Sequence, residues 1–343
     1  MKKILFVLLI SVKVLLSQTL NDLTFGSDST FDVISWNIEW FPNSNLTADY
    51  VQTILKQLDA DIYALQEIED TSLLKQVLSN IPEYEGYFNS TYYGGLAYVY
   101  NKNTVQINSK YEIYISQPYW NAFPRKPQVL DISFNGDNYI IINNHFKCCG
   151  DGYLDINDSG DEENRRKQAI TLLKEYIDNN FNNKKVILLG DLNDIYTDLP
   201  SNNVFQELID DSNYMLIDMP IAQSTSSNWS YPTWPSHLDH IIINDKLFSD
   251  FQSSNSLVSV IKIDNYMNSW NDYEQNVSDH RPIGIKLYSS NPSIINDEFN
   301  YKKKILKTID LMGRESDAFS GGLKFNIYES GKVEKIISNI QHR

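Results

Sequence analysis

The residues best suited to chemistry lie in six short polar motifs, each next to an apolar segment. The motifs are Trp36-Asn37, Gln66-Glu67, Asn144-His145, Gly190-Asp191-Leu192-Asn193, Leu238-Asp239-His240 and Ser278-Asp279-His280. Carboxylate and amide oxygens are hard ligands for divalent cations, and histidine can hold or move a proton near neutral pH. Together the six motifs indicate a divalent-metal hydrolase site.

The elements that must position these motifs are strands that meet at one edge. Four motifs follow strand-like runs, at 33–34, 62–65, 139–142 and 186–189, and two precede such runs, at 241–243 and 283–287. Strands that end at an edge and strands that begin there run antiparallel to each other. Helical spacing appears at 51–58, 73–81 and 169–177, with Thr47 and Thr71 as candidate N-caps for the first two. The sequence therefore predicts mixed sheets, covered by helices, with one polar edge.

Hydrolysis of a phosphate ester requires neutralised phosphoryl oxygens and an aligned water molecule. Glu67, Asp279 and Asn37 supply oxygen ligands suited to Mg²⁺, and also to Mn²⁺ or Ca²⁺. Asp191 and Asn193 lie two residues apart, so on an extended segment they face the same side. We expect one of them to orient or deprotonate water while the other donates or accepts a hydrogen bond at a phosphate oxygen.

The histidines divide by the face on which they lie. Asp239 can fix the tautomer of a histidine, most simply His280, and leave its other ring nitrogen free for phosphate. His240 follows Asp239 directly and points to the opposite face, so we expect a structural role. His237 shares the face of Asp239, which makes it a candidate to line the substrate pocket, with a purely structural role as the alternative.

Composition and charge narrow the classes of protein. With 343 residues, 42% hydrophobic and 13% aromatic, the chain can bury a large core and fits a globular protein. Its net charge of −15 argues against a basic surface that wraps nucleic acid. An enzyme that reaches phosphate through metal ions is compatible with this charge, because a bound cation can dominate the local field.

The N-terminus predicts export. It reads Met1-Lys2-Lys3, then apolar runs at 4–10 and 12–16, then Ser17-Gln18. A basic start, a short apolar segment and a small residue near its end indicate a secretory signal peptide over residues 1–18. A membrane anchor is the alternative, but Lys13 interrupts a stretch that is already short for a bilayer. We expect a secreted or cell-surface protein without stable membrane insertion.

An acidic segment at 150–164 interrupts the alternation of helices and strands. Residues 155–160 resemble the start of a calcium loop, but Arg166 occupies the place of the closing glutamate. A calcium site and a solvated surface loop are the two interpretations.

Cys148 and Cys149 are the only cysteines of the chain and are adjacent. Export would permit a disulfide between them, and two ordinary thiols are the alternative. No further cysteine exists to complete a metal–thiolate cluster.

In order and spacing, the motifs quoted above resemble the endonuclease/exonuclease/phosphatase family, the DNase-I-like metal-dependent phosphoesterases, over about residues 30–289. The resemblance implies a four-layered α/β sandwich, with two packed mixed β-sheets flanked by helices and the site at the sheet edges. It implies metal at Asn37, Glu67 and Asp279. It also implies that His145 and His280 contact the scissile phosphate, which Arg125 of the motif Phe123-Pro124-Arg125-Lys126-Pro127 approaches.

The chain departs from the DNase-I-type pattern at two places. Glu69 stands where those enzymes carry a basic residue that contacts the DNA groove. Gly94 and Gly95 stand where they carry a glutamate that orients the first histidine. Both departures weaken the inference to double-stranded DNA and leave the hydrolytic residues in place.

The C-terminal part has a resemblance of its own. The stretch 289–293 is rich in Ser, Asn and Pro and indicates a linker, which we place at 290–300, between a catalytic part at 19–289 and a tail at 301–343. Segments 309–315 and 325–335 resemble a C-terminal sorting domain of the type IX secretion system. A small β-hairpin packed on the enzyme is the alternative.

The sequence therefore predicts an exported metal-dependent phosphodiesterase, with nucleic acid (DNA or RNA) as substrate and the type IX secretion machinery as partner. A sphingomyelinase-like or small-molecule phosphodiesterase is the alternative in chemistry. An inactive protein that has the same fold and only binds a surface is an alternative from another functional class. The aromatic residues in the segment 231–235 suit membranes, base stacking or loop packing.

Overall fold

The computed structural model describes residues 18–88, 94–288, 305–310, 313–315, 322–328 and 333–338. The chain divides into two compact units, Met1–Ser290 and Asn291–Arg343. Residues 1–17 of the expected signal peptide and the expected linker at 290–300 lie outside the described residues. Within the described ranges, no helix has both the length and the apolar character that a membrane span requires.

The first sheet has six strands. In order across the sheet they are β11 (Leu257–Val260), β12 (Ile283–Leu287), β1 (Phe31–Phe41), β2 (Ile62–Ile68), β4 (Gly95–Asn101) and β3 (Tyr84–Phe88). β1 and β2 are parallel, whereas β12 runs antiparallel to β1. The ends of β1 and β2 and the start of β12 therefore lie at the same edge.

The second sheet repeats this arrangement. Its strands, in order, are β5 (Gln106–Glu112), β6 (Gln128–Phe134), β7 (Asp137–His145), β8 (Lys185–Asp191), β10 (Asp239–Asn244) and β9 (Tyr214–Leu216). β7 and β8 are parallel, and β10 runs antiparallel to β8. The prediction of mixed sheets is confirmed, because strands that end in polar motifs lie beside strands that begin with them.

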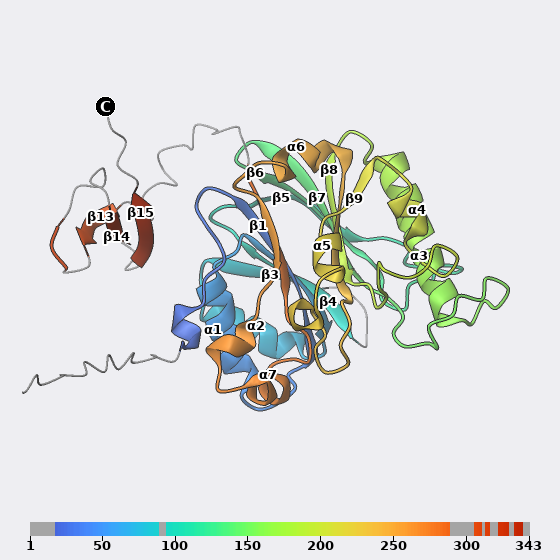
Figure 1. Cartoon of the computed structure of the whole chain (residues 1–343), viewed down its shortest axis with the longest axis horizontal. Coiled ribbons are helices and arrows are strands. Elements are labelled where there is room, and N and C mark those ends of the chain that lie inside the picture. The colour runs from blue at the N-terminus through green and yellow to red at the C-terminus, as the bar shows by residue number, and fades with distance from the viewer. Residues whose placement is uncertain are drawn as a thin grey trace, which may run out of the picture. The chain divides into compact units, whose positions relative to one another are not determined.

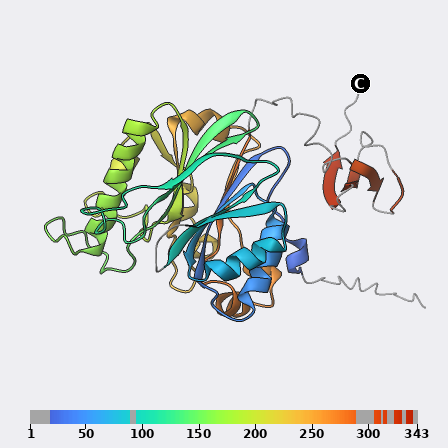
Figure 2. The same ribbon diagram turned by 180° about the vertical axis from the view of Figure 1, so that it is seen from behind.

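Helices cover the outer face of each sheet, while the inner faces pack on each other (Figures 1 and 2). α1 (Thr47–Leu58), α2 (Thr71–Ser79) and α7 (Trp270–Asn276) share a core with the first sheet. α3 (Glu162–Asn180), α4 (Gln206–Ile209) and α5 (Met219–Ala222) share one with the second. A third core fills the space between the sheets. The predicted four-layered sandwich is confirmed.

Five shorter elements complete the first unit. They are α6 (Phe248–Phe251) and the 3₁₀ helices η1 (Leu20–Asp22), η2 (Ser226–Asn228), η3 (Asp245–Leu247) and η4 (Ile263–Tyr266).

The starts of the first two helices differ from the prediction by one residue. Thr71 is the first residue of α2, and the preceding Asp70 accepts the hydrogen bond from Leu73 N at 2.8 Å. Thr47 is likewise the first residue of α1, and its hydroxyl accepts a bond from Ser44 N instead of capping the helix. The predicted N-caps at Thr47 and Thr71 are therefore wrong. Asp70 is the more favourable N-cap before Thr71, and α1 begins after Leu46 without a side-chain cap.

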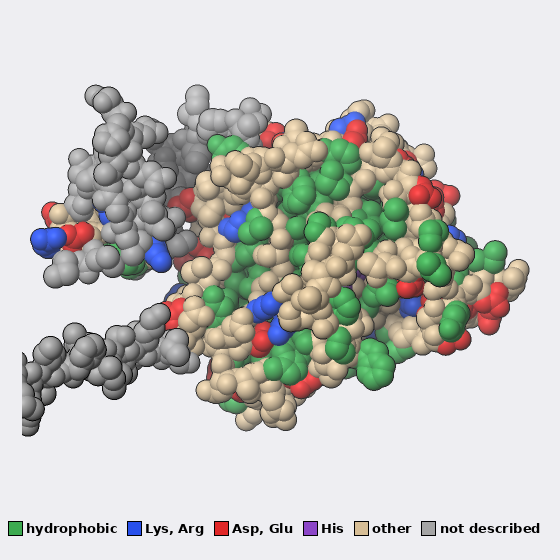
Figure 3. All heavy atoms as spheres, in the orientation of Figure 1, with side chains coloured by type: hydrophobic (Ala, Val, Ile, Leu, Met, Phe, Trp, Pro, Cys, Tyr) green, Lys and Arg blue, Asp and Glu red, His purple; other side chains and the backbone are tan. Residues whose placement is uncertain are grey.

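The acidic segment before α3 is a loop whose carboxylates close local turns. Asp155 and Asp158 accept hydrogen bonds from backbone N–H groups two residues further on, and Asp161 caps α3 through Asn164 N at 2.7 Å. Arg166, at the place of the missing glutamate, is buried and bonds to Glu163 and Asp194. Figure 3 shows acidic side chains gathered at the edge of the molecule where this loop and α3 lie.

Cys148 and Cys149 lie in the same region as free thiols, with their sulfur atoms 2.9 Å apart. This is the thiol form of the two alternatives.

In the second unit, three antiparallel strands form a small sheet. They are β13 (Ile305–Asp310), β14 (Gly322–Tyr328) and β15 (Val333–Ser338), with β14 in the middle. The expected β-type tail is present as this sheet.

Candidate active site

The six motifs meet where the two sheets expose the same edge. In the second sheet, Asp191 at the end of β8 is in register with His145 on one side and with Asp239 on the other. In the first sheet, Asn37 on β1 is in register with Gln66 on β2, so that Glu67 follows on the neighbouring strand. We call this edge the rim.

Asp191 lies at the centre of the rim and joins the two sheets. Its Oδ2 accepts a hydrogen bond from Asn37 Nδ2 at 2.9 Å, although Asn37 belongs to the other sheet. The same oxygen lies 3.5 Å from Nε2 of His145 and 3.9 Å from Nε2 of His280. Asn37 Nδ2 also donates to Glu67 Oε1 at 3.1 Å. One buried carboxylate is thus in contact with groups from both halves of the fold.

The two rim histidines differ in charge. Nδ1 of His280 lies 2.7 Å from Asp239 Oδ2. Burial alone would lower the pKa of His280, but the Asp239 and Asp191 carboxylates outweigh burial and raise it to about 10. Burial lowers the pKa of His145 well below its usual value, and the positive charges of Arg125 and His280 add to this shift. Near neutral pH, His280 is a cation and His145 is neutral.

Several carboxylates of the rim lie close to one another. Asp279 N–H donates to Glu39 Oε2 at 3.1 Å. Burial, followed by repulsion from Asp279, raises the pKa of Glu39 to about 7, and burial likewise raises the pKa of Asp191 to about 7. Glu67, His145 and Asp191 also offer ligand atoms that all lie within 4.8 Å of one another. Carboxylates that repel each other at this range are a donor set that fits a divalent cation.

Two further residues lie at the rim; the sequence predicts no role for Glu39 and, for Tyr231, only membrane binding, base stacking or loop packing. Glu39 lies two residues after Asn37, and that spacing on a strand was the available signal. Tyr231 places its ring 4.7 Å from the ring of His280. Burial, followed by the charge of Asp279, raises the pKa of Tyr231 to about 12. No spacing in the sequence connects Tyr231 with His280.

Arg125 reaches the rim through the space that a glycine leaves. Gly94 has a φ of +57°, and a Cβ placed there would lie 3.0 Å from the guanidinium of Arg125. Arg125 Nη1 donates to Phe146 O at 3.3 Å, and Gly94 N–H donates to the carboxylate of Glu69. His145 Nδ1 is buried and has no hydrogen-bond partner among the residues that the structure describes. A side chain at position 94 would therefore displace the guanidinium of Arg125.

Asn193 lies beside Asp191, but not by strand alternation. β8 ends at Asp191, and Asn193 has a φ of +55°. Its backbone N–H donates to Asp191 Oδ1 at 3.1 Å, and its side-chain amide lies 3.5 Å from Phe146 O. The expectation of an extended segment is wrong, because a turn closed by the Asp191 carboxylate holds the two residues together.

His237 and His240 lie beneath the rim, where both contact Asp218. His240 uses Nδ1 for Asp218 at 2.6 Å and Nε2 for Asp194 O at 2.9 Å. His237 uses Nε2 for Asp218 at 3.0 Å, and its Nδ1 accepts a bond from Ser230 N. All three side chains are buried. The structural role expected of His240 agrees with these contacts, and His237 has no free nitrogen to offer a substrate.

Replacing His240 with alanine is expected to lower the free energy of unfolding by roughly 3 to 5 kcal/mol, because it removes one partner of a buried ion pair. Asp218 raises the pKa of His240 by more than burial lowers it. The pair therefore stabilises fully below about pH 6.5, and this stabilisation fades as pH rises through the raised pKa. Urea unfolding at about pH 5.5 and about pH 9 should show a smaller difference between His240→Ala and wild type at the higher pH.

Turnover of His240→Ala should stay near the wild-type value under conditions in which the variant is folded. A larger loss of turnover in His240→Ala than in His280→Ala would contradict the structural assignment of His240.

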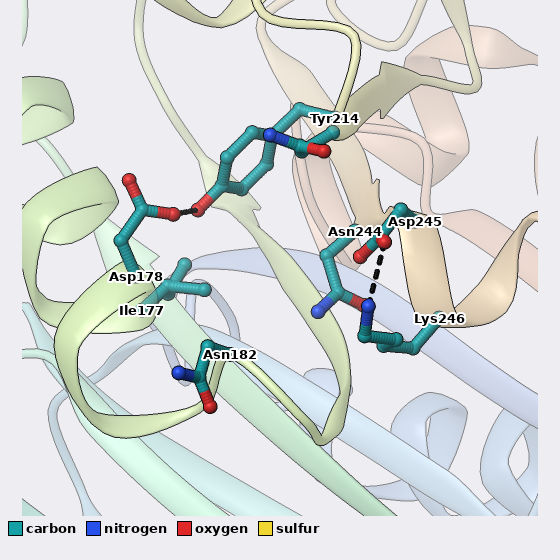
Figure 4. Close-up of a pocket in the computed structure, with 8 residues that line it drawn as sticks. Ile177, Asp178, Asn182, Tyr214, Asn244, Asp245 and Lys246 are labelled. Atoms are coloured by element: carbon teal, nitrogen blue, oxygen red, sulfur yellow. Dashed lines mark hydrogen bonds and ion pairs between the residues drawn. The ribbon is translucent and has the colours of Figure 1, made fainter.

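A hollow lies at the end of the second sheet that is opposite the rim (Figure 4). Its volume is about 290 Å³, and it is lined by Ile177, Asp178, Asn182, Asn213, Tyr214, Asn244, Asp245 and Lys246. Asp178 accepts a bond from the Tyr214 hydroxyl, and Lys246 pairs with Asp245. Five residue steps along β10 separate Asn244 from Asp239, which is roughly 17 Å. The lining contains no histidine, so the rim is the better candidate for a reaction site.

Comparisons with known proteins agree with this geometry. A sequence model of the endonuclease/exonuclease/phosphatase family matches residues 34–280, a range that contains all ten residues expected at the site. A search of curated proteins by similarity found no match.

Several solved structures have a similar fold. D. rerio TDP2, complexed with single strand DNA product, has a TM-score of 0.58 and 14% identity, over 76% of this chain and 100% of that one. The human Nocturnin catalytic domain with bound sulfate anion has a TM-score of 0.54 and 16% identity, over 76% and 93%. An endonuclease/exonuclease/phosphatase from Bacteroides vulgatus has a TM-score of 0.54 and 13% identity, over 76% and 99%.

Proposed function

Because this chain belongs to the endonuclease/exonuclease/phosphatase family, we propose that it is a metal-dependent phosphodiesterase that acts as an extracellular nuclease. The observation that carries the proposal is the rim. There Asp191 joins both sheets and lies between a cationic histidine, a neutral histidine and a group of carboxylates. Charge of both signs around one buried carboxylate suits a phosphodiester, whose oxygens need cations and whose attacking water needs a proton acceptor.

Glu67, Asp279 and Asn37 would hold the metal ion, with Mg²⁺ the first choice and Mn²⁺ or Ca²⁺ also suited to oxygen ligands. When bound, the ion neutralises charge on the phosphoryl oxygens. Asn37 now directs Nδ2 toward Glu67 and Asp191, and its Oδ1 accepts a bond from Glu39 N–H. To offer its oxygen to a cation, the amide of Asn37 must turn over.

The remaining rim residues bind phosphate and move protons. His280, held by Asp239, can donate from Nε2 to a phosphate oxygen, and His145 and Arg125 can contact the same phosphate. Asp191 accepts a proton readily near neutral pH, because its pKa is raised to about 7, so it can activate the attacking water. The contact between Asn193 N–H and Asp191 Oδ1 orients that carboxylate.

Nucleic acid is the substrate that we propose. D. rerio TDP2, which shares the fold, has been solved with single strand DNA product. Glu69, whose carboxylate accepts a bond from Gly94 N–H, stands where DNase-I-type enzymes carry a basic residue. We therefore expect flexible or single-stranded nucleic acid to be cut more readily than duplex.

We also propose that the protein is exported. The proposal is supported by the basic and apolar N-terminal sequence and by the resemblance of the tail to a type IX sorting domain. The three-stranded sheet of the second unit is compatible with such a tail.

A substrate panel with and without chelator tests the function. It contains plasmid DNA, single-stranded DNA, RNA, sphingomyelin and a phosphomonoester, each incubated with EDTA and then with Mg²⁺, Mn²⁺ or Ca²⁺. We expect hydrolysis of nucleic acid to stop on chelation and to return with metal, because Glu67 and Asp279 need the cation. Glu67→Gln serves as the matched variant and should require a higher metal concentration.

Full activity after exhaustive chelation would overturn the mechanism. Hydrolysis of sphingomyelin or of a small phosphodiester, with every nucleic acid untouched, would replace the nuclease proposal with the lipid or small-molecule alternative.

A further inference from the structure

One exposed tryptophan sits on the rim in a backbone conformation that tryptophan rarely adopts. Trp40 has a φ of +50°, and 51% of its surface is exposed. The pairing of β1 with β2 is irregular between Asn37 and Phe41, which marks a bulge at this point. For a bulky residue a positive φ is strained, and bulges beside active sites commonly redirect a side chain.

The neighbours of Trp40 hold it in this position. Its own N–H donates to Glu67 Oε2 at 3.1 Å. Before it, Glu39 N–H donates to Asn37 Oδ1, and after it the buried Phe41 accepts bonds at its carbonyl from Glu69 N and Asp70 N. The backbone of Trp40 is therefore held directly against Glu67, a carboxylate that we assign to the metal.

Packing alone does not account for this residue. Half of the indole remains in water, and glycine would adopt the same φ without strain. A strained backbone that presents a half-exposed aromatic ring beside reacting groups is typical of a functional position.

We propose that Trp40 stacks on a nucleobase next to the scissile phosphate and thereby selects unpaired strands. The inference rests on the proposed nuclease function. The half-exposed indole offers an uncharged aromatic face, so an uncharged aromatic base is the part of the substrate that suits it. A base stacked within a duplex has no free face, whereas a single-stranded base does.

A lipid surface fits this position less well. Membrane-binding segments combine exposed apolar side chains with basic ones, whereas the rim beside Trp40 is acidic and its indole is only half exposed.

The test measures base preference with the full chain at saturating Mg²⁺. Base preference is the kcat/KM for a single-stranded oligonucleotide divided by that for the same strand with abasic sites around the scissile bond. Stacking on an aromatic side chain is worth roughly 5- to 150-fold per base, so the wild type should prefer the intact strand by at least about fivefold. Trp40→Ala and Trp40→Gly should both bring this ratio close to one, and Trp40→Phe should keep part of it.

Two comparisons separate stacking from folding. Alanine keeps the strain at a positive φ and glycine relieves it, so Trp40→Gly should melt roughly 2 to 4 °C above Trp40→Ala while both lose the preference equally. Trp120 is similarly exposed, at 52%, but lies in a turn whose Asn121 bonds to Ser159 and Arg165. Trp120→Ala should keep the wild-type preference.

Three results would overturn the inference. The first is an unchanged kcat/KM on both strands in Trp40→Ala and Trp40→Gly. The second is an equal loss on intact and abasic strands, which would mean that Trp40 acts only through Glu67. The third is a loss confined to sphingomyelin vesicles, which would assign the ring to a lipid surface.

A failure of the nuclease proposal would give a different experimental result from a failure of the Trp40 assignment. If the wild type hydrolyses neither strand, that proposal falls and this inference falls with it. If it hydrolyses both strands and the variants keep the ratio, only the assignment of Trp40 falls.

Discussion

Replacing His280 with alanine is expected to lower turnover by at least about 100-fold, which is the lower end of a typical acid–base contribution. His280 carries the proton that Asp239 and Asp191 stabilise, with its pKa raised to about 10. The substitution removes both this proton and the positive charge that we propose faces the phosphate. His145→Ala should have a comparable effect, because His145 contacts Asp191 from the other side. Single-turnover hydrolysis of a single-stranded oligonucleotide at saturating Mg²⁺ measures both losses.

The alanine variant leaves the buried Asp239 without its partner, so a second variant is needed. His280→Asn can keep a hydrogen bond to Asp239 from its side-chain amide while losing the transferable proton. It should melt close to the wild type and still lose turnover. Near-normal turnover of His280→Asn would show that His280 only orients its neighbours.

Replacing Asp191 with asparagine is expected to lower turnover between about 100- and 10,000-fold, because the amide cannot accept a proton from water. The same change should stabilise the metal-free protein at about pH 8. Burial raises the pKa of Asp191 from 3.8 to about 7. Over this range the folded state binds more protons than the unfolded state, so the wild type loses stability as pH rises from about 4 to about 7.

Thermal melts of metal-free wild type and Asp191→Asn at about pH 4 and about pH 8 test whether the wild type loses stability as pH rises. The melting temperatures should be closer at the lower pH. Asp32→Asn, a buried aspartate at the opposite end of β1, is the matched control and should keep its turnover. A turnover loss without any gain in stability at pH 8 would mean that Asp191 does not carry an unfavourable charge.

The parts of this site that could be predicted are those set by strand direction. Polar motifs at the ends of four runs and at the starts of two require antiparallel neighbours. His145, Asp191 and Asp239 lie together at one edge, as that rule requires. The pairing of Asp239 with His280 was also predictable, because a buried carboxylate needs a donor.

Local backbone geometry and distant partners could not be predicted. The bulge between Asn37 and Phe41 gives no signal in the pattern of apolar residues. The left-handed conformation of Asn193 replaces an expected strand with a turn. His237 is held by Asp218, which is 19 residues away and on another element. Such contacts depend on how loops pack, and loop packing produces no regular spacing of apolar residues in the sequence.

The hydrogen bond from Asn37 to Asp191 crosses from one sheet to the other. Neither sheet alone carries the whole of the proposed reaction centre, because Asn37 and Glu67 come from the first and His145 and Asp191 from the second. During refolding, we therefore expect hydrolysis to return only once the two sheets have docked, which makes turnover a measure of that docking.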